Sequence, residues 1–147
     1  MFEFIYFMVR ISNLEILKIL MENSRIPYIK IAKIFGVSET AVRKRIKKLE
    51  RDGVIRKYTI EVDLRKIGYE INALIGIDTE PERYIPTLEK LREMKEVMKL
   101  CSSTGDHMIL IECWLKNSKE LTEFIKTLEK IEGVTKICPA IILEKIK

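Results

Sequence analysis

The spacing of apolar residues predicts three short helices in the first third of the chain. Residues 14–22 repeat apolar side chains at helical intervals, and Asn13 is the expected N-cap. Pro27 suits the first turn of a second helix, which we expect to end at about Phe35. A third helix is expected over residues 39–51, capped by Ser38 and ended by a glycine.

The third predicted helix has two chemically different faces. Val42, Ile46 and Leu49 lie at i, i+4 and i+7, and we expect this stripe to be core. Gly36, just before it, supplies a backbone conformation that a larger residue would strain. The other face carries polar and basic residues, namely Thr40, Arg43, Lys44, Lys47 and Arg51. Such a helix behind a glycine turn is typical of a helix-turn-helix that enters the major groove of DNA.

After these helices the pattern changes to alternation. Residues 54–62 (VIRKYTIEV) predict a linking strand, and residues 63–69 turn the chain at a domain boundary. The rest predicts strands over 70–79, 97–103, 107–115 and 134–146, and helices over 84–95 and 119–131. Ser118 is the expected cap of the last helix, and residues 107–115 are apolar enough to be buried on both faces.

The order of these elements predicts an α+β protein of two domains. Residues 1–62 form a winged-type helix-turn-helix domain with its linking strand. Residues 63–147 follow the order βαββαβ, which is that of a ferredoxin-like sandwich.

Charge is divided unevenly between the two predicted domains. Residues 1–62 hold 13 Lys/Arg against 7 Asp/Glu, whereas residues 63–147 hold 14 against 15. The basic excess therefore belongs to the first domain, as expected of a DNA-binding module joined to a domain with another task. A solvated basic helix without a partner is the alternative, which the adjacent glycine turn disfavours.

Position along the third helix suggests a role for each polar residue. Ser38 is placed to contact a phosphate, or to act only as an N-cap. Thr40 and Arg43 lie in the first turns, which enter the groove deepest, and are the candidates for base contacts. Lys44 is placed for bases or phosphates. Lys47 and Arg51, further along, are candidates for the DNA backbone.

Composition argues against several other classes of protein. The three cysteines are too far apart for a metal knuckle, and we expect them to be buried and reduced in a cytoplasmic protein. With a single histidine and no phosphate-binding or dinucleotide motif, no catalytic constellation, metal site or cofactor is expected.

The first residues, MFEFIYFMVRI, are apolar but far shorter than the roughly 20 residues of a membrane-spanning helix. They lack a basic leader, so no membrane partner is expected. Two interpretations of the first residues stay open: they form an arm or short strand that packs on a partner subunit, or Met8 is an alternative start.

Three segments together carry a resemblance to a known family. They are IAKIFGVSETAVRKRIKKLERDGVI, VDLRKIGYEINALIGID and STGDHMILIECWLKNSKELTEFI. In sequence and spacing the chain resembles the Lrp/AsnC (feast/famine) family of prokaryotic transcription regulators, from about Asn13 to Lys147. The three segments are similar to its helix-turn-helix, its hinge, and the turn between two strands of its ligand-binding domain.

The resemblance implies partners and a second site. Members dimerise through the ferredoxin-like domain, often assemble into tetramers or octamers, and bind free amino acids or related metabolites near the TGD turn. That turn is Thr104, Gly105 and Asp106 here, although the same residues are also common in plain hairpin turns. Many members carry a second acidic residue two positions after the aspartate. This chain has Met108 there, which cannot pair with an amino group.

These observations lead to one principal hypothesis. The chain is expected to be a dimeric or larger regulator that binds double-stranded DNA at a pseudo-palindromic site, gated by an amino acid or related metabolite. The alternative is a metabolite-binding scaffold that no longer reads DNA. A small enzyme on the same fold lacks any supporting motif.

Overall fold

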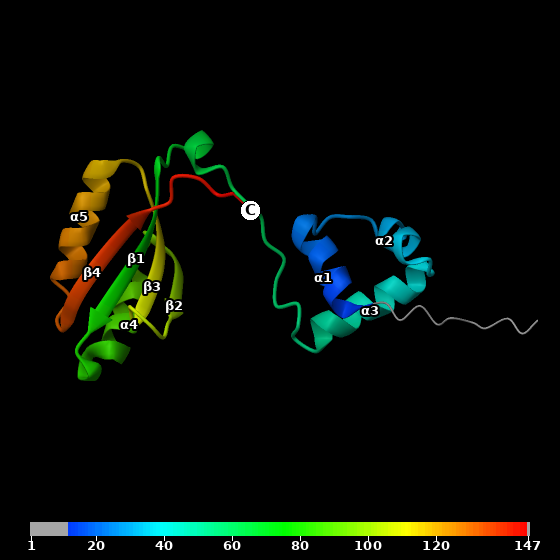
Figure 1. Cartoon of the computed structure of the whole chain (residues 1–147), viewed down its shortest axis with the longest axis horizontal. Helices are drawn as coiled ribbons and strands as arrows, with labels where there is room; N and C mark the ends of the chain where they lie inside the picture. Colours follow the sequence, from blue (N-terminus) through cyan, green and yellow to red (C-terminus); the bar gives the residue numbers. More distant parts are fainter. Residues whose placement is uncertain (1–11, 147) are drawn as a thin grey trace, which may run out of the picture. The chain divides into compact units, whose positions relative to one another are not determined.

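The computed structural model describes residues 12–146, so the predicted arm over residues 1–10 lies outside the described residues. The described chain divides into two compact units between Glu61 and Val62. Figure 1 labels the helices and strands of the two units.

The N-terminal unit contains three helices, α1 (Asn13–Glu22), α2 (Tyr28–Phe35) and α3 (Glu39–Arg51). Their apolar stripes meet in one core, formed by Ile16, Leu20, Ile31, Ala32, Val42, Ile46 and Leu49. The stripe predicted for the third helix is thus confirmed as core. Gly36 ends α2 in the left-handed region at a φ of 64°, as expected for the turn of a helix-turn-helix.

Two predictions for this unit are wrong. The residue before α1 is Ser12, and Asn13 is already helical, because the helix begins one residue earlier than the apolar pattern suggested. The linking strand expected over residues 54–62 is not formed within the described chain. A strand needs a neighbour for its N–H and C=O groups, and residues 12–146 offer none there. Tyr58 and Ile60 are exposed in consequence.

The C-terminal unit is a four-stranded antiparallel sheet with two helices, which confirms the predicted βαββαβ order. Its strands are β1 (Ile71–Thr79), β2 (Val97–Ser102), β3 (Ile109–Leu115) and β4 (Val134–Ile141), and its helices are α4 (Tyr84–Glu93) and α5 (Ser118–Glu129). Short 3-10 turns, η1 (Leu64–Ile67) and η2 (Pro81–Arg83), precede β1 and α4. The strand order is β2-β3-β1-β4, with β1 and β3 in the centre (Figure 1).

Alternation along the central strands separates a buried face from an outer face. Alternate apolar residues of β1 and β3 pack with Leu91 of α4 and with Leu121, Phe124 and Leu128 of α5. The intervening residues of β3 are only half-buried, so the expectation that residues 107–115 are buried on both faces is wrong. Both helices belong to the cluster on one face of the sheet, and the other face is covered by neither.

Some predicted boundaries also move. Asn117, not Ser118, caps α5, because its side chain accepts a hydrogen bond from the Glu120 N–H at 3.0 Å. β3 begins at Ile109 rather than at residue 107, and β4 ends at Ile141 rather than at residue 146. At the start of β3 the Met108 N–H is donated to the Asp78 side chain, 2.9 Å away.

Candidate DNA-binding surface and effector turn

The start of α3 is fixed by its cap. The Ser38 hydroxyl accepts a hydrogen bond from the Ala41 N–H at 3.1 Å, and Glu39 places a carboxylate in the first turn. Both features stabilise the positive end of the helix dipole. Ser38 therefore acts as the expected N-cap, and its side chain is still exposed.

The structure brings the predicted DNA-contacting residues to the exposed side of α3. The six residues in question are Ser38, Thr40, Arg43, Lys44, Lys47 and Arg51, and all of them are exposed. Val42, Ile46 and Leu49 on the same helix are buried. The helix thus presents a polar and largely cationic surface while its apolar stripe holds it to α1 and α2.

Arg43 is held by two neighbours. Its Nη2 atom lies 2.6 Å from Glu39 Oε1, one helical turn earlier, and its guanidinium lies over the Tyr28 ring, 5.1 Å from the ring centroid. Half of the Arg43 side-chain surface stays exposed. Within the described residues, Lys44 and Lys47 make no ion pair.

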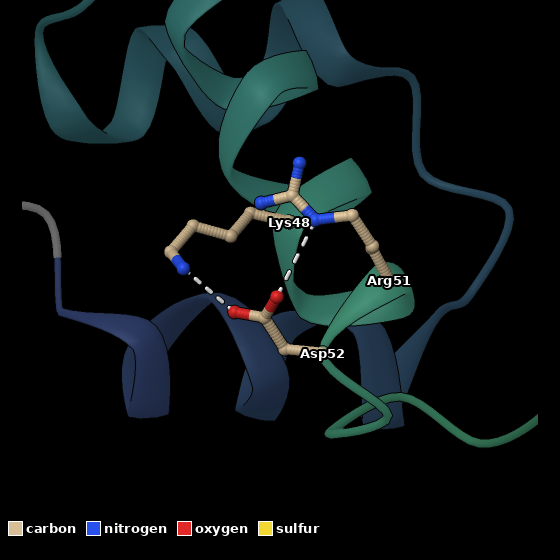
Figure 2. Close-up of polar contacts among 3 residues, drawn as sticks. All are labelled: Lys48, Arg51 and Asp52. Carbon is tan, nitrogen blue, oxygen red and sulfur yellow. Dashed lines mark hydrogen bonds and ion pairs between the residues drawn. The ribbon is translucent and has the colours of Figure 1, made fainter.

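At the other end of α3, two cations share one carboxylate. Asp52 accepts from Lys48 Nζ at 2.7 Å and lies 3.5 Å from Arg51 Nε. Figure 2 shows both side chains on the one carboxylate. The hydrogen bond from Lys48 is the main cause that holds the pKa of Asp52 below its ordinary value. Arg51 is thus partly neutralised within the protein, whereas Lys47 is not.

Tyr58 is a contact that the sequence did not indicate. Its hydroxyl donates to Glu50 Oε1 at 2.6 Å, which joins the chain after α3 to that helix. About half of Tyr58 is exposed, and the partial burial of the rest, followed by this hydrogen bond, raises the pKa of Tyr58 above its ordinary value. Only the fold brings residues 50 and 58 together, and no motif marked them.

The predicted effector turn lies between β2 and β3. Thr104, Gly105 and Asp106 are all exposed, and Gly105 has a φ of 115°, which favours glycine. The structure therefore brings the three residues together in an accessible turn.

Beside this turn lies a carboxylate that the sequence analysis missed. Asp78, on β1, accepts from the Met108 N–H at 2.9 Å, and its Oδ2 lies 3.0 Å from His107 Nδ1. The Met108 hydrogen bond is the main cause that lowers the pKa of Asp78. His107 also lies against Gly76, where any side chain would collide with its ring. No sequence signal connects positions 78 and 107, which are 29 residues apart.

The outer face of the sheet holds a second missed cluster. Glu112 accepts from Lys99 Nζ at 2.6 Å, from Asn72 Nδ2 at 3.2 Å and from Trp114 Nε1 at 3.4 Å. Burial pushes the pKa of Glu112 upward, but the three hydrogen bonds outweigh it, so the pKa is lowered. Leu74, on the same face, is 41% exposed.

Other chemistry finds little support in the described residues. No group of three or more His, Cys, Asp or Glu side chains in residues 12–146 is arranged to hold a metal ion. The three cysteines, Cys101, Cys113 and Cys138, are free thiols. Cys113 is buried, and burial raises its pKa to about 12. Cys101 is exposed, contrary to the expectation that the cysteines are buried. In the same part of the chain, no helix combines the length and apolarity needed to cross a membrane.

Comparison with protein families gives a match for each unit. Residues 10–56 match the family model described as winged helix-turn-helix DNA-binding. Residues 72–147 match the model described as Lrp/AsnC ligand binding domain, and this match covers more than half of the chain.

Individual relatives agree with these matches. The chain is 49% identical to the HTH-type transcriptional regulator LrpA of Pyrococcus abyssi, over 90% of this chain and 94% of the relative. The structure of AsnC from E. coli superimposes with a TM-score of 0.77 at 30% identity, covering 93% of this chain and 95% of that one. The L-Met complex of the regulator NMB0573 from Neisseria meningitidis shares the fold, with a TM-score of 0.78, 21% identity, and coverage of 93% and 92%.

Proposed function

Because this chain belongs to the Lrp/AsnC family of DNA-binding transcriptional regulators, we propose that it reads its operator through the exposed side of α3. Thr40 and Arg43 contact base edges in the major groove, and Lys44 contacts bases or phosphates. Ser38, Lys47 and Arg51 contact the DNA backbone. The observation that carries this proposal is the exposure of all six residues on a helix whose opposite stripe is core.

The contribution of each cation differs. Lys47 has no carboxylate partner in the described chain, so its full charge is available to phosphate. Arg51 shares Asp52 with Lys48, so the two cations together add about one net charge at that end of the helix. We therefore expect Lys47 to contribute more than Arg51 to the salt dependence of binding.

The functional DNA-binding unit is a dimer with a two-fold axis. The outer face of the sheet supports this, because it leaves Leu74 half-exposed and is covered by neither helix of the unit. A two-fold axis places two recognition helices on half-sites about one helical turn apart. The site is then a pseudo-palindrome in double-stranded DNA.

A small effector binds at the turn formed by Thr104, Gly105 and Asp106. The match to a ligand-binding domain and the exposure of the turn support an amino acid or related metabolite as this effector. Backbone N–H groups of the turn hold its carboxylate, and Asp106 pairs with its amino group. Because Met108 offers no charge, the effector is held more weakly than in a site with two acidic residues.

The DNA-binding proposal is tested with the double variant Arg43→Ala, Lys44→Ala. Loss of one bidentate base contact costs about 1–3 kcal/mol, and loss of a phosphate contact reduces the salt slope of log K by about one. A matched control, Lys126→Ala with Lys130→Ala, removes two exposed cations from the C-terminal unit instead. Unchanged specific affinity and salt slope in the α3 variant would refute the groove assignment.

Effector binding is tested by calorimetric titration of the full chain with a panel of amino acids. We expect weak binding of at least one amino acid, which Asp106→Asn abolishes without changing the thermal stability. Absence of binding at millimolar concentration, or equal binding by the Asn variant, would contradict the assignment.

A further inference from the structure

Arg43, the arginine proposed to contact a base, already makes two side-chain contacts in the free protein. Its guanidinium lies over the Tyr28 ring, 5.1 Å from the centroid, while Nη2 contacts Glu39 Oε1 at 2.6 Å. One support comes from α2 and the other from the first turn of α3. The contact with Glu39 engages one of the five N–H donors of the planar group.

The aromatic support is anchored in the fold. Tyr28 is the first residue of α2, is half-buried, and packs against the core of the N-terminal unit. Its ring is therefore a fixed platform. A cation over such a ring gains about 0.5–1 kcal/mol at an exposed site, a factor of about two to five in an equilibrium.

The carboxylate support restricts the remaining freedom. Glu39 and Arg43 are spaced i,i+4, and both side chains are about half-exposed. Such pairs are weak, a factor of about two in an equilibrium, so the pair cannot hold the arginine alone. Together the ring and the carboxylate restrict where the guanidinium can lie, one from α2 and the other from α3.

A free arginine side chain loses rotamer freedom when it is fixed on a base, and a side chain that is already positioned loses less. We propose that Tyr28 and Glu39 are positioning residues that preset Arg43 for bidentate contact with a guanine, so that α2 and α3 jointly set base preference at that position. This inference rests on the proposed groove assignment of Arg43. Guanine is the base concerned because its O6 and N7 acceptors match the two parallel N–H groups of a fixed guanidinium.

The same helix supplies a matched control. Lys48 and Asp52 also form an i,i+4 pair, at 2.7 Å, near the C-terminal end of α3 (Figure 2). This pair has the opposite orientation of charges, and no aromatic contact to Lys48 occurs within the described residues. Asp52→Asn therefore removes a carboxylate of similar exposure at the C-cap of α3 without touching Arg43.

The experiment compares affinities of the full chain for two kinds of DNA. One is a site selected by the wild-type protein from random sequences, and the other is that site with single G·C pairs replaced by A·T. The position whose preference disappears in Arg43→Ala defines the base that Arg43 contacts. The measured quantity is the ratio of the two affinities at that position.

Each variant has its own expected signature. Tyr28→Leu lowers the ratio about two- to five-fold, whereas Tyr28→Phe, which keeps the ring, leaves it unchanged. Glu39→Gln lowers the ratio about two-fold while raising the affinity for both DNAs, because a negative charge leaves the surface that faces phosphate. Asp52→Asn raises both affinities and leaves the ratio unchanged.

Failure of the inference is separable from failure of the proposed function. If Arg43→Ala changes the preference at no position, the groove assignment itself is wrong. If Arg43→Ala abolishes a preference that Tyr28→Leu and Glu39→Gln retain or strengthen, only the positioning role is overturned. Should Tyr28→Leu fail to fold, Glu39→Gln decides the matter, because its exposed position lies outside the core.

Discussion

Replacement of Gly76 by alanine tests the contact that shapes the edge of the effector turn. Gly76 lies on β1, opposite Leu110 of β3, on the outer face of the sheet. A Cβ at this position would lie 2.8 Å from His107 Nε2 and closer still to other ring atoms. The ring must therefore swing away, and its contact with Asp78 is lost.

The magnitude follows from two opposing effects. Gly76 is not among the glycines with positive φ, so alanine fits the backbone and stabilises the chain by about 0.4–1 kcal/mol through the unfolded state. Loss of a hydrogen bond to a charged carboxylate costs about 1.5–3 kcal/mol. The net expectation is that Gly76→Ala destabilises the protein by about 1–2 kcal/mol.

The assay is equilibrium unfolding in urea, at one protein concentration, in a double-mutant cycle with His107→Ala. In the His107→Ala background the added Cβ no longer collides with a ring, so Gly76→Ala should stabilise that variant by about 0.5 kcal/mol. An equal cost in both backgrounds, or stabilisation of the wild-type background, would refute the steric reasoning.

Three further outcomes follow from the described contacts. Ser38→Ala removes the cap of α3 and should lower the free energy of unfolding by about 1 kcal/mol, with Ser38→Thr retaining most of it; equal urea midpoints would contradict the cap. The fold lowers the pKa of Asp78, so its carboxylate binds a proton more tightly in the unfolded chain than in the folded one. The stability that Asp78 contributes is therefore present above its ordinary pKa of 3.8 and is lost as the pH falls below it. In a plot of melting temperature against pH, Asp78→Asn should therefore show a smaller decrease at acid pH than the wild type. An equal decrease in both proteins would contradict this role of Asp78. Cys113, with a pKa of about 12, should resist iodoacetamide at pH 8 until the protein unfolds, and its labelling in the folded protein would show that the site opens.

Periodicity sufficed to predict the elements that carry function. The stripe of Val42, Ile46 and Leu49 is core because a 3.6-residue repeat leaves little choice of face. The range of α3 agrees with the prediction because Ser38 is a strong cap. Where two capping residues are adjacent, as in Ser12-Asn13 and Asn117-Ser118, the predicted cap was one residue late.

Contacts between residues that are distant in the sequence could not be predicted from the periodicity of apolar residues. The sequence placed Asp78 in one predicted strand and His107 at the start of another, but their pairing depends on the register of β1 and β3 and on the space left by Gly76. The same holds for the contacts of Arg43. Its i,i+4 spacing from Glu39 can be seen in the sequence, whereas its contact with Tyr28 depends on how α2 packs on α3. The strand expected over residues 54–62 needs a neighbour that the described part of the chain does not supply.

The central claim is that two copies of α3, related by a two-fold axis, read DNA through their exposed face. Its most direct test is sequencing of the DNA that the full chain selects from a random library, with the Arg43→Ala, Lys44→Ala variant in parallel. We predict a pseudo-palindrome whose half-site centres lie about 10 base pairs apart for the wild type, and no such motif for the variant. Selected DNA without two-fold symmetry, or the same motif from both proteins, would contradict the claim.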